Sequence, residues 1–240
     1  MLTVGSLFSG IGGIELGLER TGYFKTLWQV ENDPYATEVL KKHWPKVKRY
    51  GDIRTVKKLP YADLICGGFP CQDISNAGQR KGITGERSGL WKEFVRIIRL
   101  VRPKYILVEN VSALISRGLD IVLWDLAQSG YDAEWTIISA CAFGASHPRQ
   151  RLFLVAYPNK RGLARRREEL QPRIFQAPRS KAVRWNLAAP YVCRASDGIP
   201  NRVDRIKCLG NAVVPQVAEF IGGLIVQFDK MCKQNEERVK

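Results

Sequence analysis

The sequence alternates short apolar runs with segments of helical periodicity over its first two thirds. Residues 90–101 (LWKEFVRIIRLV) repeat apolar side chains on one helical face, and residues 119–126 do the same. The apolar runs that predict strands are 2–8, 27–31, 62–66, 105–109, 135–140 and 152–157. Strands that alternate with helices favour the α/β class, with a Rossmann-like, doubly wound and mainly parallel sheet.

The end of this pattern suggests how the chain is divided. The last two predicted strands are joined only by CAFGASHPRQR, which is short enough for an antiparallel pair. A basic, proline-punctuated stretch follows, and then GNAVVPQVAEFIGGLIVQF, a turn before an apolar helix. We predict a first domain at 1–157, a small basic inserted region at 158–207, and a C-terminal segment at 208–240 that returns to the first domain.

Charge adds a partner to this picture. The chain has 240 residues and a net charge of +15, and residues 160–207 hold 13 Lys+Arg against 4 Asp+Glu. A basic region of this kind favours a polyanion, most simply nucleic acid, with an acidic membrane surface as the alternative. No apolar run approaches the roughly 18 residues of a membrane span, and the N-terminus does not resemble a signal peptide. We therefore expect a soluble, cytoplasmic protein without a membrane partner.

The six cysteines narrow the candidate chemistry. They form no CxxC pair, and only His43 and His147 could join them as ligands, so structural zinc is not expected. An intracellular location also argues against disulfides. Cys71 differs in context, because it follows the turn residues GGFP in the loop after a predicted strand. A cysteine in such a loop is either an inert thiol or a nucleophile.

A glycine-rich turn follows the first predicted strand. Gly10, Gly12 and Gly13 would either let a ligand approach the backbone or serve close packing of strand and helix. Glu31 ends the next strand, at the spacing where an acidic residue accepts hydrogen bonds from ribose hydroxyls. Together these residues suggest an adenosine-containing cofactor. Asp52 is either an ordinary turn residue or a contact to the adenine edge.

Cys71 and Glu109 both lie at the carboxyl ends of predicted strands, which meet at one edge of a parallel sheet. There they could serve as nucleophile and proton donor, although Glu109 could also cap a helix. Arg149 and Arg151 alternate just before a strand, so both side chains should lie on one side and could hold a carbonyl oxygen or a phosphate. Residues 72–89 form a polar, basic loop that could close over a polyanion.

Seven ordered motifs resemble the DNA (cytosine-5)-methyltransferases that use S-adenosylmethionine, in their prokaryotic or phage form. The motifs are LFSGIGG, VEND, GDI, GGFPCQDIS, ENV, the HPRQR stretch and LGNAVVPQ. They cover residues 1–157 and 208–228. The resemblance implies a catalytic and cofactor-binding first domain, target recognition by the basic region, and double-stranded DNA as partner. It also implies a monomer that protects DNA in restriction-modification or in phage, with a cognate restriction endonuclease as a further partner.

The resemblance also assigns chemical roles. In this family a thiolate adds to carbon 6 of a cytosine that is flipped out of the duplex, and carbon 5 then takes the methyl group. Cys71 would supply the thiolate. Glu109 would bind the base at N3 and the exocyclic amine and protonate N3, while Arg151 and Arg149 would hold the O2 side. The motifs do not identify the base that removes the carbon 5 proton.

The remaining site residues are implied by the same motifs and by the basic stretches. Those that would surround S-adenosylmethionine are Phe8, Gly10, Gly12, Glu31, Asn32, Asp52, Ile53, Pro70, Leu90, Asn211 and Ala212. Those expected to contact DNA are Gln72, Ser75, Arg80, Lys81, Arg87, Arg165, Arg166 and Arg167. The resemblance implies no metal.

Two departures from the family pattern keep alternatives open. His147 stands where relatives commonly carry glutamine, which should change a supporting hydrogen bond but not the chemistry. The region between the arginine pair and LGNAVVPQ has only about 50 residues, which is short for base-specific recognition. The alternatives are a transfer RNA cytosine-5 methyltransferase and a noncatalytic DNA-binding relative that needs a partner.

Overall fold

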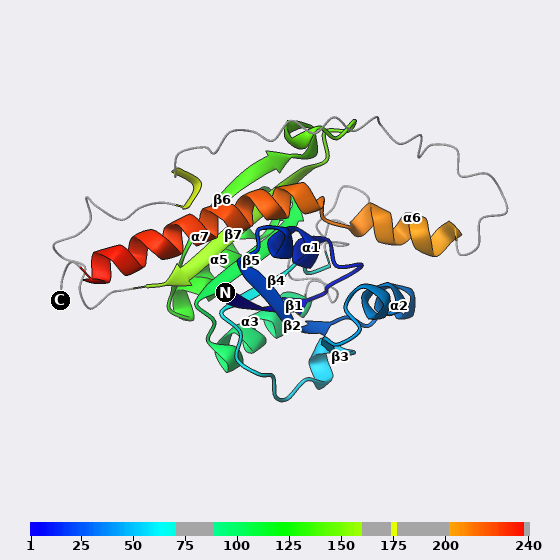
Figure 1. Ribbon diagram of the computed structural model, residues 1–240, viewed down its shortest axis with the longest axis horizontal. Coiled ribbons are helices and arrows are strands. Elements are labelled where there is room, and N and C mark those ends of the chain that lie inside the picture. The colour runs from blue at the N-terminus through cyan, green and yellow to red at the C-terminus, as the bar shows by residue number, and fades with distance from the viewer. Residues whose placement is uncertain (71–88, 160–173, 177–201, 238–240) are drawn as a thin grey trace.

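The computed structural model describes residues 1–70, 89–159, 174–176 and 202–237 (Figure 1). Within these residues one sheet of seven strands has the order β3-β2-β1-β4-β5-β7-β6. The strands are β1 (Leu2–Leu7), β2 (Phe24–Val30), β3 (Lys48–Tyr50), β4 (Leu64–Gly67), β5 (Tyr105–Val111), β6 (Tyr131–Ser139) and β7 (Gln150–Pro158). The α-helices are α1 (Gly13–Arg20), α2 (Pro34–His43), α3 (Leu90–Val101), α4 (Leu114–Arg117), α5 (Leu119–Gln128), α6 (Arg202–Asn211) and α7 (Pro215–Glu237), and the 3-10 turns are η1 (Ile53–Thr55), η3 (Ala140–Phe143) and η5 (Ile174–Gln176).

The strand directions confirm the predicted architecture. Every pairing from β3 to β5 is parallel, whereas β7 runs antiparallel to both β5 and β6. The mainly parallel sheet and the antiparallel last pair are therefore as predicted. Strand β3 was not predicted, because its three residues, KRY, carry no apolar alternation. Helix α3 begins and ends at the residues that the apolar periodicity indicated.

Helices cover both faces of the sheet, because successive strand side chains point to opposite sides. On β5, Ile106 and Val108 join the core beneath α3 and α5. Tyr105 and Leu107 alternate with them and pack in the second core, with α1 and α7. Figure 1 shows α7 lying across this second face beside α1. The two cores fix the sheet between helical layers and leave its strand ends free to carry the site.

Helix α7 packs closely on α1. Ile221 and Ile225 of α7 are fully buried. A Cβ on Gly17 of α1 would lie 2.2 Å from the carbonyl oxygen of Pro215, so the close approach requires glycine. Helix α6 spans the boundary that the sequence analysis placed between residues 207 and 208. The division of the chain at that point stays a prediction.

One expectation about apolar stretches is wrong. The helical stretch Val203–Gln234 contains an 18-residue window that is apolar enough, by length and composition, to cross a membrane, although no stretch of this kind was expected from the sequence. The expectation concerned unbroken apolar runs, whereas this window tolerates interspersed polar residues. Val217, Ile221 and Ile225 are buried in the core that α7 forms with α1 and the sheet. We therefore assign α7 as a core helix.

Candidate functional site

The predicted site residues gather at one edge of the sheet. The carboxyl ends of β1, β2, β4 and β5 meet there, and β7 begins there because it runs in the opposite direction. In sheets of this type, ligands bind in the crevice formed by the loops beyond the carboxyl ends. Residues 8–12, 31–33 and 68–70 form such loops here, and Arg149 stands just ahead of β7.

The glycines of the first turn have different tasks. Gly10 has φ +55°, and a Cβ there would meet nothing within 4 Å among the described residues. Gly12 also has a positive φ, but its Cβ would lie 2.4 Å from the ring of Trp44. A Cβ on Gly13 would lie 2.4 Å from the carbonyl oxygen of Val213. Close packing therefore explains Gly12 and Gly13, whereas Gly10 faces open space in the described structure and leaves room for a ligand.

Glu31 joins two of the loops at this edge. Its Oε2 accepts a hydrogen bond from the backbone N–H of Gly10 at 2.7 Å, and its Oε1 accepts one from the N–H of Asp33 at 2.8 Å. Each carboxylate oxygen has further lone pairs for a ligand. Glu31 therefore fixes the glycine turn against the start of α2 and keeps acceptor capacity.

A cavity of about 520 Å³ lies between the ends of β1 and β2, the η1 turn and the start of α3. Its lining residues are Phe8, Val30, Glu31, Asn32, Gly51, Asp52, Ile53, Arg54, Gly89, Leu90 and Glu93. Six of these were predicted from the sequence to bind the cofactor, namely Phe8, Glu31, Asn32, Asp52, Ile53 and Leu90. The structure thus brings an apolar lining together with several carboxylates; we call this space the first cavity.

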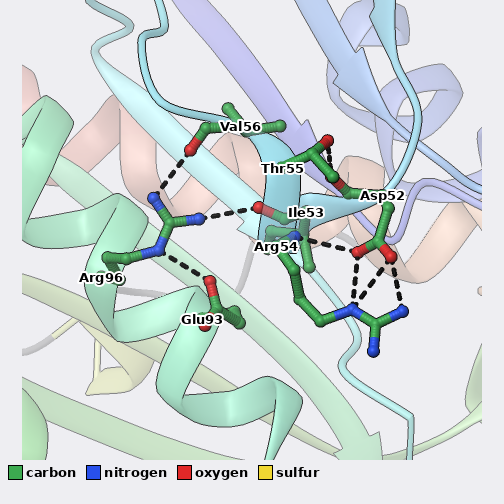
Figure 2. Close-up of polar contacts among 7 residues, drawn as sticks. All are labelled: Asp52, Ile53, Arg54, Thr55, Val56, Glu93 and Arg96. Carbon is green, nitrogen blue, oxygen red and sulfur yellow. Dashed lines mark hydrogen bonds and ion pairs between the residues drawn. The ribbon is translucent and has the colours of Figure 1, made fainter.

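Asp52 begins the η1 turn. Its side chain accepts a hydrogen bond from the backbone N–H of Arg54 at 2.9 Å, as a helix N-cap does. The guanidinium of Arg54 also binds both carboxylate oxygens at 2.5–3.0 Å (Figure 2). These hydrogen bonds lower the pKa of Asp52. Asp52 is therefore a turn residue, and its ionised carboxylate also lines the first cavity. Its contact with an adenine edge stays a prediction.

A second cavity, of about 320 Å³, shares Phe8, Glu31 and Asn32 with the first. The other predicted site residues that line it are Gly10, Pro70, Glu109, Arg149, Arg151 and Asn211. Residues predicted for the cofactor and residues predicted for the base therefore meet in one space. Pro70 is the last described residue before Cys71, so the loop that carries Cys71 starts at this cavity.

Glu109 and Arg151 form the charged centre of the second cavity. Glu109 of β5 pairs with Phe153 in the register, which places Arg151 of β7 at the diagonal position on the same face. Arg151 Nε lies 3.2 Å from Glu109 Oε1. Burial raises the pKa of Glu109 to about 7, although Arg151 and Arg149 oppose that rise. A carboxyl with this pKa exchanges a proton near neutral pH.

Gly68 lets the loop after β4 pass close to Glu109. A Cβ on Gly68 would lie 2.8 Å from Glu109 Oε2 and 3.2 Å from the Glu109 carbonyl oxygen. Asn110 holds the next residue of this loop, since its Nδ2 donates to the carbonyl oxygen of Phe69 at 3.2 Å. Asn110 is buried, and its Oδ1 accepts from the N–H of Val111 at 2.8 Å. The two neighbouring residues of ENV therefore differ in task, with Glu109 in the cavity and Asn110 anchoring the loop.

Arg149 and Arg151 both line the second cavity, but their side chains contact different groups. Arg149 has φ +29° and lies just before β7, so the strand alternation does not extend to it. One of its terminal nitrogens donates to the carbonyl oxygens of Gly210 at 2.8 Å and Ala212 at 2.7 Å. Arg149 therefore holds the end of α6 at the site. Of the two arginines, Arg151 is the one that forms an ion pair with Glu109 among the described residues.

Glu15 and Lys207 are among the lining residues of the second cavity that sequence reasoning missed. Glu15 is 1 % exposed, and its Oε2 has no hydrogen-bond partner among the described residues. Burial raises the pKa of Glu15 to about 6. Lys207 of α6 lies 2.5 Å from Asp33 Oδ2 at the start of α2. In the sequence, only the place of Glu15 next to the apolar Ile14, on the side of α1 that is buried, could have predicted that Glu15 is a site residue. Nothing in the sequence around Lys207 predicted that it lines the cavity.

Several predicted residues do not line these cavities or cannot be located. Gly12 and Ala212 are absent from the described lining of both cavities. Those outside the described residues are Cys71, Gln72, Ser75, Arg80, Lys81, Arg87, Arg165, Arg166 and Arg167. No cluster of three or more His, Cys, Asp or Glu side chains suited to a metal ion occurs in the part of the chain that the structure describes.

Comparison with known proteins decides the family. Residues 2–190 match the family described as C-5 cytosine-specific DNA methylase. The chain belongs to this family. The match confirms the resemblance seen in the motifs, although LGNAVVPQ lies beyond the matched range.

Individual proteins that are similar to this chain agree with this assignment. The type II methyltransferase M2.BsuMI of Bacillus subtilis is 40% identical over 163 residues, which are 65% of this chain and 42% of that protein. The type II methyltransferase M.Bsp6I of a Bacillus species is 36% identical over 66% of this chain and 53% of its own length. The solved structure of S. pombe Dnmt2 methyltransferase superposes with a TM-score of 0.55 and 25% identity, covering 66% of this chain and 51% of that one. This likeness confirms the fold class, while the chain spans about half the length of these relatives.

Proposed function

We propose that the protein transfers a methyl group from S-adenosylmethionine to carbon 5 of a flipped-out cytosine in double-stranded DNA. The observation that carries this proposal is the buried Glu109, with a pKa of about 7, in the cavity from which the loop of Cys71 departs. The similarity to type II methyltransferases supports a role in restriction-modification or phage DNA protection, with a cognate endonuclease as partner. The protein would act as a monomer in the cytoplasm, at the nucleoid or on phage DNA.

The first cavity suits the adenosine end of the cofactor. The side chains of Phe8, Ile53 and Leu90 offer apolar walls for a flat base. Glu31 and Asp52 supply carboxylate acceptors for ribose hydroxyls and for an exocyclic amine. The open Gly10 and the lining residue Asn211 would hold the remainder in the second cavity. S-adenosylmethionine, when bound, supplies an electrophilic methyl group on a sulfonium.

The second cavity suits the target base. Protonated Glu109 would donate to N3 of the cytosine, and its other oxygen would accept from the exocyclic amine. Arg151, 3.2 Å from Glu109 Oε1, is placed to hold the neighbouring O2 and to orient the carboxyl. Protonation of N3 removes the negative charge that addition at carbon 6 would otherwise build on the ring. Glu109 must therefore carry a proton when the base is attacked, and its raised pKa supports this.

Cys71 would form the covalent bond to carbon 6 from the opening of this cavity. The thiolate attacks the face of the ring, which is accessible only when the base leaves the stack. Elimination after loss of the carbon 5 proton restores the thiolate and releases the methylated base. The net charge of +15 supports attraction of a DNA duplex, chiefly through phosphate contacts that carry no sequence information.

Label transfer tests this proposal. Purified protein is incubated with tritiated S-adenosylmethionine and with duplex DNA of mixed sequence or, separately, transfer RNA, and the nucleosides are separated. The proposal predicts label in 5-methylcytosine from DNA only. Label in transfer RNA alone would show that transfer RNA, and not DNA, is the substrate. No label from either, by protein that binds DNA and cofactor, would favour a noncatalytic relative.

A further inference from the structure

The first cavity has two facing walls that come from separate segments. The η1 turn contributes Asp52 and Ile53, and α3 contributes Leu90 and Glu93. These segments are about 40 residues apart in sequence, and they do not belong to neighbouring strands. Backbone pairing within the sheet therefore does not fix the distance between them. Contacts made by side chains between the two segments must therefore set the width of the cavity.

Arg96 of α3 connects the two walls. Its two terminal nitrogens donate to the carbonyl oxygens of Ile53 and Val56, each at 2.7 Å, and its Nε donates to Glu93 Oε2, also at 2.7 Å (Figure 2). Ile53 and Val56 are the first residue and the C-cap of η1. One guanidinium thus holds both ends of the turn to α3.

The chemistry of this contact makes it specific to arginine. The guanidinium is planar and rigid, so it can donate to two carbonyl oxygens and to a carboxylate at the same time, whereas a lysine ammonium is a single flexible point donor. Hydrogen bonds from a charged donor are also stronger than neutral ones. Glu93, one turn earlier on the same helix, fixes the third edge of the fork and itself lines the cavity.

We propose that Arg96 is a positioning residue for cofactor binding, which sets the separation between the η1 turn and α3 and thereby holds Asp52 and Ile53 opposite Leu90. Arg96 does not line the cavity in the described structure and acts through its contacts. This inference rests on the proposed function, because it takes the first cavity to be the site of the adenosine end of the cofactor.

The test compares Arg96 with Arg99, one turn later on the same helix. Arg99 Nε donates to Ser129 Oγ at 3.1 Å, at the end of α5 and away from the cavity lining. The variants Arg96→Gln and Arg99→Gln each remove one guanidinium from α3, so they match in charge. Affinities of the full-length proteins for S-adenosylhomocysteine and for adenosine are measured by calorimetry, and thermal unfolding is followed without ligand.

We expect Arg96→Gln to weaken both affinities by about tenfold, the scale of one lost charge-assisted hydrogen bond, and Arg99→Gln to leave them within twofold of the wild type. Arg96→Lys should recover part of the loss, because it keeps the charge and one donor. In methylation assays Arg96→Gln should raise KM for S-adenosylmethionine with kcat within twofold, a split that general destabilisation would not give.

The outcomes separate the two proposals. Wild-type protein that binds S-adenosylhomocysteine, together with equal affinities for Arg96→Gln and Arg99→Gln, overturns the role of Arg96 alone. Wild-type protein that binds neither ligand overturns the proposed function, and the role of Arg96 with it. If Arg96→Gln does not fold, Arg96→Lys decides, and unchanged affinity in that variant also contradicts the positioning role.

Discussion

Arg151 Nε and Glu109 Oε1 lie 3.2 Å apart across the antiparallel pair of β7 and β5. The reversed direction of β7 brings an arginine from near the start of one strand to a carboxyl near the end of another. Burial raises the pKa of Glu109, and the positive charge of Arg151 opposes that rise. Burial and the charge of Arg151 therefore shift the pKa of Glu109 in opposite directions.

Removal of Arg151 should move the pH dependence of catalysis. In Arg151→Met the burial of Glu109 is no longer opposed by the nearest charge, so its pKa should rise above the present value of about 7. Because the proposed chemistry needs protonated Glu109, the alkaline limb of the methyl-transfer rate should shift to higher pH, while the maximal rate falls. Single-turnover rates from pH 5.5 to 9 measure this, with Lys41→Gln, from the exposed pair with Glu38, as control. If the alkaline limb did not shift, Glu109 would not be the group whose protonation the reaction requires.

Gly68→Ala should impair catalysis through Glu109. The added Cβ would lie 2.8 Å from Glu109 Oε2, so the carboxyl or the loop toward Cys71 must move. We expect methyl transfer to fall by about tenfold or more, because small displacements of reacting groups are costly, while cofactor affinity changes little. Rate and affinity are measured beside Gly223→Ala, whose Cβ meets nothing within 4 Å in the described structure. Equal rates for the two variants would show that this contact does not matter.

Glu15 should make stability depend on pH. Burial raises the pKa of Glu15 in the folded protein from its ordinary value of 4.5 to about 6. The protonated form therefore favours folding, and this contribution, about 2 kcal/mol, is fully present below pH 4.5 and lost as pH rises through 6. Glu15→Gln should lose less free energy of unfolding between pH 4.5 and 7.5 than the wild type, by that amount. Urea denaturation at both pH values measures this difference. Glu109 titrates in both proteins, so its contribution cancels in the comparison. Equal losses in free energy of unfolding for the two proteins would refute the buried state of Glu15.

The contact between α1 and α7 should depend on Gly17. Gly17→Ala would place its Cβ 2.2 Å from the carbonyl oxygen of Pro215, and we expect a loss of roughly 1–3 kcal/mol in stability from overpacking. Gly223→Ala, within α7 and with open space in the described structure, should instead gain roughly 0.5–1 kcal/mol from helix propensity. Thermal unfolding of the two variants measures the difference, and a Gly17→Ala variant as stable as the wild type would contradict the packing of α7.

The sequence predicted the elements that leave a local apolar pattern. Helix α3 follows from apolar spacing and β5 from an unbroken apolar run, and Glu109 could be placed because it ends that run. The partners of Arg149 could not be predicted, because its side chain donates to the carbonyl oxygens of Gly210 and Ala212, which are 61 and 63 residues away. The task of Gly12 was equally hidden, since Trp44 decides it. Long-range packing leaves no local pattern in the sequence.

The most direct measurement of the central claim is covalent capture on duplex DNA that contains 5-fluorocytosine, in the presence of S-adenosylmethionine. Fluorine at carbon 5 cannot leave as a proton does, so the bond between enzyme and base should persist. The account predicts one adduct per protein, mapped by peptide mass spectrometry to Cys71, absent in Cys71→Ser and strongly reduced in Glu109→Gln. An adduct on another residue, or methylation of ordinary DNA without any adduct at Cys71, would contradict the account.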